Sequence, residues 1–289
     1  MINHKFKNRI KKIKRGFLIW RILILLLVNL WLDNLKFKIF QTGKDKKNKV
    51  QIKRAKWFTN QLIELGSAFI KIGQLLSARP DLIPNTWIQE LSKLQDQVPQ
   101  FSYTKVEEII KKELGHNFSE IKQISSTPIG SASLAQVHKA TLRNGKEVVF
   151  KVQRPNLKNL FIIDLNIMQQ IAFILQQNKN WSRGRNWVEI AKECRKVLMK
   201  ELDFKCEAQF AARFRQQFID DENVEVPEVI WDFSSEKVLC LSYLEGTKIS
   251  DIKNLKSKNI NLPKIAEIGA ISYLKQLVNY GFFHADPHP

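Results

Sequence analysis

The chain has 289 residues, enough for one large or two modest domains, and at 44% hydrophobic it can bury a core. Its formal net charge is +19, but residues 1–60 hold 17 lysines and arginines against two acids, so +15 of this charge is N-terminal. These basic residues flank an apolar run and lack interleaved aromatics on a folded face, which argues against nucleic-acid binding. The three cysteines have no CxxC or metal-ligand spacing, so we expect reduced thiols and no metal–cysteine site.

Residues 1–48 are predicted to form a membrane-associating segment and a linker. Phe17 to Leu32 contains 14 apolar residues of 16, interrupted by Arg21 and Asn29. As a helix this run is about 24 Å long, short of the ~30 Å bilayer core. Its basic flanks favour a helix in or on an anionic leaflet, on the cytoplasmic side; a span and a helix packed on the body are alternatives. Thr42 to Lys49 is expected to be a solvated linker.

Residues 49–122 are predicted to be a helical extension. Lys71 and Gln74 lie three apart on a polar face that is expected to be solvated, and Gly73 between them permits close approach of another backbone. Ala78-Arg79-Pro80 ends this helix, and further helices are expected around Trp87–Leu94 and Tyr103–Leu114. The helix that carries Lys71 is predicted from one apolar stripe at spacings of four and three, formed by Phe58, Leu62, Leu65, Phe69, Ile72 and Leu76.

Residues 128–155 are predicted to form strands joined by a small-residue loop and a tight turn. In the loop, backbone N–H groups can approach a bulky anion, because its residues are Gly130, Ser131, Ala132 and Ser133. Leu134 to Thr141 suits a strand, and Asn144-Gly145 suits a two-residue turn. The next apolar run ends at Lys151. Nucleotide kinases use this order, with the loop over the phosphates and the lysine on the next strand.

Trp187 to about Phe218 is predicted to be a long helical stretch with three acids, Glu201, Asp203 and Glu207. Glu201 and Glu207 are six residues apart, so roughly 600° of rotation separates them on a straight helix. A kink or two different partners would be needed. Such acids usually face solvent; the competing interpretation pairs one of them with Lys151, as in the C-helix of kinases.

The C-terminal part is predicted to contain a second hairpin and a last helix. Residues 229–231 and 238–241 would pair around a turn at Ser234-Ser235, and residues 244–248 leave the second strand where a kinase has its hinge. An amphipathic helix is expected from Leu262 to Tyr280, ended by Gly281.

Five ordered motifs resemble those of the UbiB/AarF-type atypical kinase-like family, which is linked to ubiquinone and other prenylquinone metabolism. The resemblance covers about residues 50–289. The motifs are Lys71-Ile72-Gly73-Gln74 for Lys-x-Gly-Gln, Gly130-Ser131-Ala132-Ser133 for the alanine-rich loop, Phe150-Lys151-Val152 for the nucleotide lysine, Glu201-Leu202-Asp203 for Glu-x-Asp, and His284-Ala285-Asp286-Pro287-His288-Pro289 for the catalytic loop.

The resemblance implies a role for each motif. Lys151 would bind the phosphates of Mg²⁺-ATP and pair with Glu207, and Asp286 would take the position of the kinase catalytic base. Lys71 would lie near Glu201 and Asp203, as a latch in the space where a peptide substrate binds. ATP hydrolysis or a small lipid-linked substrate is therefore favoured over protein phosphorylation. The implied partners are nucleotide, an anionic membrane surface or isoprenoid lipid, and quinone-biosynthesis proteins.

The sequence departs from the kinase pattern at its end. A metal-binding Asn and a later Asp are expected beyond the catalytic loop, but the sequence ends at Pro289. We therefore expect a gene fragment, a truncated product or half of a split pair, with little or no phosphoryl transfer.

Together these observations predict an α+β, protein-kinase-like fold. Residues 123–248 would form the N-lobe, with an antiparallel sheet and a C-helix, and residues 249–289 the start of a helical C-lobe. The preferred function is a UbiB-type kinase or ATPase that supports prenylquinone metabolism at a membrane. The alternative is a membrane-docked pseudokinase scaffold that binds nucleotide or lipid without catalysis.

Overall fold

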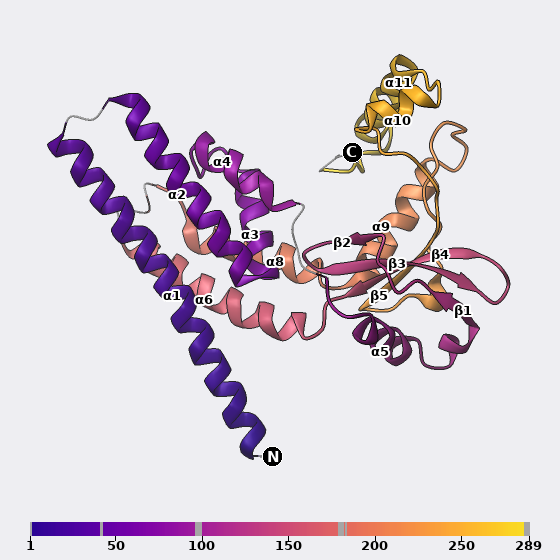
Figure 1. Ribbon diagram of the computed structural model, residues 1–289, viewed down its shortest axis with the longest axis horizontal. Coiled ribbons are helices and arrows are strands. Elements are labelled where there is room, and N and C mark those ends of the chain that lie inside the picture. Colours follow the sequence, from indigo (N-terminus) through magenta and orange to yellow (C-terminus); the bar gives the residue numbers. More distant parts are fainter. Residues whose placement is uncertain (1, 41–42, 96–99, 179–181, 183, 286–289) are drawn as a thin grey trace. The chain divides into compact units, whose positions relative to one another are not determined.

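The computed structural model describes residues 2–40, 43–95, 100–178, 182 and 184–285 (Figure 1). The chain forms two compact units that interleave in sequence. The first contains residues 1–101, 130–136 and 153–202, and the second contains residues 102–129, 137–152 and 203–289. Helices combine with an antiparallel sheet, so the predicted α+β class is confirmed.

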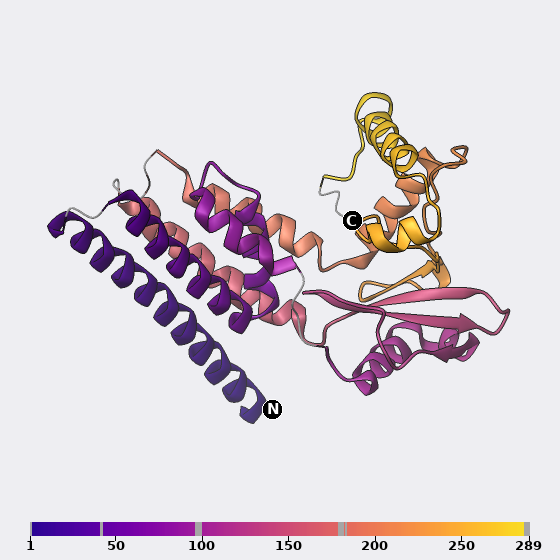
Figure 2. The ribbon, with the colours of Figure 1, turned by 45° about the horizontal axis from the view of Figure 1, so that its top comes forward.

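The first unit is mainly a helical bundle. Its helices α1, α2, α6 and α8 run side by side in two views (Figures 1 and 2). The elements of this unit are α1 (Ile2–Ile39), α2 (Lys44–Leu65), α3 (Ser67–Ser77), α4 (Asn85–Leu91), the 3₁₀ helix η1 (Ser92–Gln95), the short strand β2 (Gly130–Ser131), α6 (Leu157–Gln177) and α8 (Trp187–Lys200).

Two apolar clusters hold this bundle together. One joins α1, α2, α3, α4, η1 and α6 through residues that are at most 8% exposed, among them Ile19, Leu62, Ile70, Leu91 and Leu94. The other joins α3, α6 and α8 through Ala68, Phe161, Leu165, Leu198 and Leu202. Helix α3 contributes to both, so the helix that carries Lys71 is fixed from two sides.

The predicted single helix through residues 58–76 is wrong, because the helix is interrupted at Gly66. This residue has φ 85° and ψ −163°, a conformation that favours glycine, and it separates α2 from α3. The apolar stripe continues across the break, since Leu62, Leu65 and Phe69 stay in one cluster. Helical periodicity alone therefore did not reveal the interruption.

The predicted linker at residues 42–49 is also wrong from Lys44 onward, where α2 begins; Thr42 lies outside the described residues. Lysine is a good helix former, and Asp45 in the first turn complements the positive end of the helix dipole. High charge in this stretch marks an exposed helix surface and not a coil.

The second unit is organised around antiparallel strand pairs. The strand order is β1-β3-β4-β5. The strands are β1 (Ile121–Ile124), β3 (Ala135–Leu142), β4 (Glu147–Gln153) and β5 (Val238–Ser242). The first residues of β3 belong to the first unit, and β2 pairs with β3. Gly145, at φ 85°, closes the predicted turn between β3 and β4. The other elements are α5 (Tyr103–Leu114), η2 (Gly115–Glu120), α9 (Phe204–Gln217), η3 (Trp231–Phe233), α10 (Ile252–Ser257), α11 (Leu262–Lys275) and the π-helical turn η4 (Gln276–Tyr280).

Two further predictions about this region need correction. The long helix from Trp187 to Phe218 is divided into α8 and α9 at residues 201–203. The predicted hairpin at residues 229–241 keeps only one regular strand, β5; Val229 makes an isolated bridge to Leu241, and residues 231–233 form a 3₁₀ turn.

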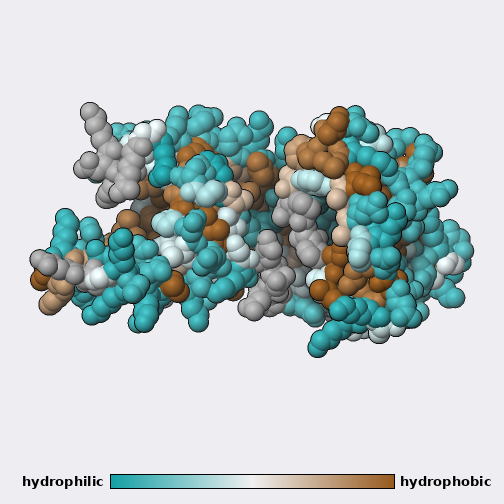
Figure 3. All heavy atoms as spheres, turned by 90° about the horizontal axis from the view of Figure 1, so that it is seen from above, coloured by the Kyte–Doolittle hydropathy of each residue, from teal (hydrophilic) through white to brown (hydrophobic). Residues whose placement is uncertain are grey.

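The last helical region carries exposed apolar side chains. None of the residues of α11 is buried, and apolar residues reach the surface in the part of Figure 3 that contains α10 and α11. They include Ile252, Ile271, Leu274, Leu277 and Val278, which are 41–78% exposed. Gly281, at φ 58°, follows η4, as predicted for a helix end.

Candidate nucleotide-binding site

Lys151 and Glu207 form an ion pair within the second unit. Lys151 lies on β4, where Phe150 and Val152 point into the core and alternation places the lysine on the opposite, half-buried face. Its Nζ is 2.5 Å from Glu207 Oε1, and the two side chains are 28% and 43% exposed. The ammonium also lies 5.1 Å from the centre of the buried Phe204 ring. Strand, pair and aromatic ring therefore fix the direction of this lysine while leaving it accessible.

The position of Glu207 depends on a break between helices. Asp203 precedes α9, and its carboxylate accepts a hydrogen bond from the backbone N–H of Lys205 at 3.0 Å. This N-cap starts a new helix and places Glu207 in its first turn, near the positive end of the helix dipole. The six-residue spacing of Glu201 and Glu207 is thereby explained, because the two acids belong to separate helices.

Lys71 and Glu201 form a second ion pair, within the first unit. Lys71 Nζ on α3 is 2.9 Å from Glu201 Oε2 at the end of α8, with side chains 26% and 32% exposed. The structure therefore brings together two of the predicted latch residues. A latch function for this pair, and a contact with Asp203, remain predictions.

The other residues of the Lys71 motif hold its helix in place. Gln74 Nε2 donates to the backbone oxygen of Leu94 at 3.1 Å. The prediction that this amide belongs to a solvated polar face is therefore wrong. A Cβ on Gly73 would collide with Leu94 Cδ1 and lie 2.9 Å from Leu62 Cδ1. Gly73 therefore permits close packing of α3, but its neighbours are leucine side chains and not the other backbone that the sequence predicted.

The small-residue loop is held by an arginine that sequence reasoning missed. Arg154 donates from Nη2 to Ser131 Oγ at 3.2 Å and to the carbonyl oxygen of Ala132 at 3.0 Å. The Ala132 N–H donates to Ala135 O at 2.8 Å, which closes the loop. Arg154 directly follows β4 and lies two residues before Asn156, the N-cap of α6. Its position at the end of a strand was the sequence signal that could have identified it. Gly130 forms the short strand β2 with Ser131, and Ser133 lies between β2 and β3. Their proposed contact with phosphate stays a prediction.

Asp286, the predicted catalytic base, lies outside the described residues. The segment before it is attached to α9, the helix that carries Glu207. The Phe282 ring is 5.9 Å from that of Phe210 and 4.1 Å from the Arg213 guanidinium, and Gln217 Nε2 donates to Phe282 O at 3.3 Å. Helix α9 therefore links the Lys151 pair to the start of the predicted catalytic loop.

The remaining candidate groups in the described part of the chain are metal ligands and cysteine thiols. No group of three or more His, Cys, Asp or Glu side chains there is placed to hold a metal ion. Burial raises the pKa of the Cys194 thiol to about 11 and that of Cys240 to about 12, which keeps both protonated.

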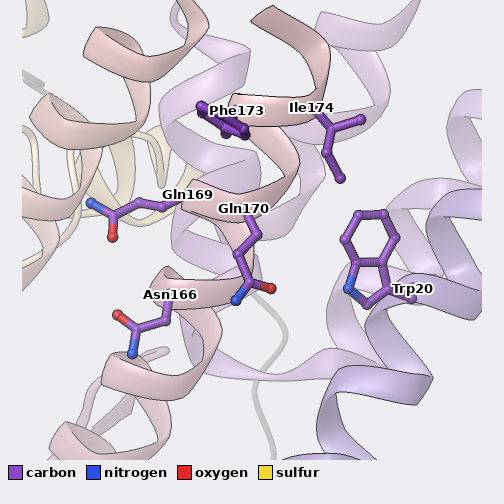
Figure 4. Close-up of a pocket in the computed structure, with 6 residues that line it drawn as sticks. All are labelled: Trp20, Asn166, Gln169, Gln170, Phe173 and Ile174. Carbon is purple, nitrogen blue, oxygen red and sulfur yellow. The ribbon is translucent and has the colours of Figure 1, made fainter. Parts of the chain in front are cut away.

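A separate cavity of about 660 Å³ lies in the helical unit, between α1 and α6. Trp20 of α1 faces the α6 side chains in Figure 4. The cavity contains none of the predicted site residues; its lining comprises Trp20, Asn166, Gln169, Gln170, Phe173 and Ile174.

The antiparallel sheet, the strand lysine and its helix glutamate define a protein-kinase-like lobe. Residues 93–289 match the family described as the ABC1 atypical kinase-like domain. The match covers more than half of the chain, which therefore belongs to the ABC1, or UbiB/AarF-type, atypical kinase-like family. The resemblance drawn from the motifs is confirmed.

Three curated relatives show how far the similarity extends. The chain is 44% identical to an uncharacterised protein, sll1770, of Synechocystis, across 96% of the chain and 48% of that protein. It is 42% identical to Protein ACTIVITY OF BC1 COMPLEX KINASE 7, chloroplastic, of Arabidopsis thaliana, across 96% and 40%. It is 34% identical to the probable protein kinase UbiB of Cellvibrio japonicus, across 97% and 50%. The chain thus spans about half the length of the curated relatives it matches.

Proposed function

We propose that the chain binds ATP, with Mg²⁺, through Lys151. In the whole protein it would act as an atypical kinase or ATPase at a membrane, supporting ubiquinone, other prenylquinone or isoprenoid-lipid metabolism. The observation that carries the proposal is the Lys151–Glu207 ion pair between β4 and α9. Family membership supports the nucleotide, and the name of the UbiB relative supports the pathway.

The chemistry of the pair suits a phosphate ligand. An ammonium group has three N–H donors, and the bond to Glu207 uses one of them. The remaining donors can bind phosphate oxygens while the carboxylate keeps the side chain directed. Because Lys151 is 28% exposed, a nucleotide can reach it without disruption of the core. Phe204 beneath the ammonium excludes water from one side and strengthens the electrostatic attraction.

Thermal melting with and without Mg²⁺-ATP tests the proposal directly. A ligand at about 100 times its dissociation constant adds ~2.7 kcal/mol to the free energy of unfolding, which is a clear shift in Tm. We expect Lys151→Ala to abolish this shift. Lys122→Ala, which removes an exposed lysine from β1 of the same unit, is the matched control and should keep it.

Measurement of phosphate release separates an enzyme from a scaffold. Release that depends on Lys151 supports ATPase activity, whereas a Lys151-dependent melting shift without release supports the pseudokinase scaffold. If the native chain shows no shift with Mg²⁺-ATP, or if Lys151→Ala keeps it, nucleotide binding at this pair is wrong.

A further inference from the structure

Helix α1 has two apolar faces, but the bundle covers only one of them. Ile19, Ile22 and Leu26 face the bundle and are 3%, 3% and 8% exposed. At 3.6 residues per turn, a second stripe lies on the opposite side of the helix. It contains Phe17, Ile24, Val28, Trp31 and Leu35, which are 40–71% exposed. We call these five residues the outer stripe.

Two buried ion pairs hold the inner face of α1 on the bundle. Near one end of the apolar run, Arg15 makes two hydrogen bonds, at 2.8 and 2.7 Å, to Asp164 of α6, whose side chain is fully buried. Near the other end, Arg54 of α2 makes two bonds, at 2.6 and 3.1 Å, to Asp33, which is 8% exposed. Separation of α1 from its partners would leave buried charges without counterions, so we expect it to stay docked.

A docked α1 cannot cross a bilayer. The described residues include two helices of sufficient length and apolar character, Lys12–Ile39 within α1 and Leu157–Gln177. However, α1 packs on α2, which would have to enter the hydrocarbon with it. Charges in that region are costly, and α2 carries seven basic residues: Lys44, Lys46, Lys47, Lys49, Lys53, Arg54 and Lys56.

The charge around α1 favours an anionic lipid surface over a second copy of the chain. Exposed Lys14 and Lys38 lie near the two ends of the outer stripe, and exposed Arg21 lies on the same side of α1 as the stripe. Residues 1–60 carry a net charge of +15, which would repel an identical surface and attract an anionic leaflet. Phe173 and Ile174 of α6, 58% and 46% exposed, extend the apolar surface beyond Trp20 (Figure 4).

We propose that α1 lies in the plane of an anionic membrane leaflet. Its outer stripe would enter the boundary between head groups and acyl chains while its inner face stays packed on α2 and α6. The chain is then attached to one leaflet and does not span the bilayer. This proposal specifies the membrane attachment included in the proposed function.

Vesicle flotation tests the outer stripe. The native chain should float with vesicles of phosphatidylcholine and phosphatidylglycerol, and should bind phosphatidylcholine alone at least about tenfold more weakly. Ile24→Ser with Trp31→Ser should lower partition into the mixed vesicles at least about tenfold. The matched control, Ile271→Ser with Leu274→Ser on α11, removes apolar residues of similar exposure and should change little. Circular dichroism checks that both variants are folded.

Depth measurement separates an in-plane helix from a spanning one. A fluorophore is placed at Phe17→Cys, Ile24→Cys and Leu35→Cys in turn and quenched by lipids with shallow or deep nitroxides; the native chain, treated alike, gives the background of its own cysteines. We expect the same shallow depth at all three positions. A deep Ile24 position between two shallow ends would instead show a span and overturn the proposal.

Other outcomes would also overturn it. One is a failure of the native chain to bind the mixed vesicles, and another is an α11 control that loses as much vesicle binding as the α1 variant. A dimer in size-exclusion chromatography that the Ile24 and Trp31 changes dissociate would show that the outer stripe binds a second copy of the chain. Mg²⁺-ATP melting is measured on the same variants. A nucleotide shift that survives the loss of vesicle binding would show that the α1 changes affect membrane attachment and not ATP binding. The two proposals can therefore be tested separately.

Discussion

Two buried ion pairs of the helical unit differ from the ion pair at the candidate site of the lobe. In the helical unit, Arg15 and Arg54 each make two hydrogen bonds to an aspartate with a nearly or fully buried side chain. In the lobe, Lys151 makes one bond to a glutamate that is 43% exposed. A buried pair is hard to open because each charge depends on the other. A half-exposed pair opens at little cost, as a ligand-binding lysine requires. Accessibility thus separates pairs that hold the fold from pairs suited to a function.

The largest effect is expected when one buried pair is broken. Asp164→Ala leaves the Arg15 guanidinium, 16% exposed, without its carboxylate. We expect a loss of about 3–5 kcal/mol in the free energy of unfolding, measured by urea denaturation with tryptophan fluorescence.

Two control variants sharpen this result. Asp81→Ala removes an acid from the exposed Arg79–Asp81 pair of the same unit and should change stability little. Arg15→Met with Asp164→Leu removes both charges and should recover most of the loss, because apolar side chains replace a buried pair at little cost. If Asp164→Ala is as mild as Asp81→Ala, the proposed difference between buried and exposed pairs is wrong.

The second-largest effect on stability is expected from a change in packing within the helical unit. Gly73→Ala places a Cβ against Leu62, Leu91 and Leu94, all of them at most 2% exposed. Their methyl groups have little room to move, so we expect a loss of about 1–3 kcal/mol in urea denaturation. Gly16→Ala is the matched control in α1, where the new Cβ only touches Ile167 at 3.9 Å. It should stabilise the chain by up to ~1 kcal/mol through helix propensity. Equal effects of the two changes would show that the close packing at Gly73 is unimportant.

The sequence revealed features that depend on local order. Lys151 follows an alternating strand and an Asn-Gly turn, and both patterns act over a few residues. The motifs identified the family and placed Lys151 with Glu207 and Lys71 with Glu201. The spacing of Glu201 and Glu207 indicated either a kink or two different partners, and Asp203 as an N-cap was the signal that would have located the break between the two helices.

The sequence did not reveal contacts that depend on tertiary structure. Arg15 and Asp164 are 149 residues apart, and no local pattern pairs them. Arg154 was overlooked because its partners are a backbone oxygen and a serine in a loop distant in sequence. The break at Gly66 was hidden because the apolar stripe continues through it, so periodicity predicted one helix where the backbone forms two.

A pH effect is expected from a buried histidine in the lobe. His138 is 1% exposed; its Nδ1 lies 2.8 Å from Ser125 O, and its Nε2 has no hydrogen-bond partner among the described residues. Burial lowers the pKa of His138. The unfolded chain therefore binds more protons between this lowered pKa and about 6.5. Stability should be full above about pH 6.5 and fall as the pH drops through the folded pKa. His138→Phe should reduce this dependence in urea midpoints between pH 7.5 and 5.5, whereas His116→Phe on the exposed η2 turn should not.

The smallest effect on stability is expected at the half-exposed Lys71–Glu201 pair. Water already solvates both side chains, at 26% and 32% exposure, so removal of one charge leaves no strongly buried ion behind. We expect Lys71→Met to change the free energy of unfolding by at most ~1 kcal/mol, and Lys151→Met to behave similarly. Since the methionine keeps most of the aliphatic stem, the variants test the charge and not the packing. A loss near that of Asp164→Ala would mean that Lys71 holds the fold, and would count against its use as a latch. A small loss would leave the pair free to open and close at little energetic cost, which a latch requires.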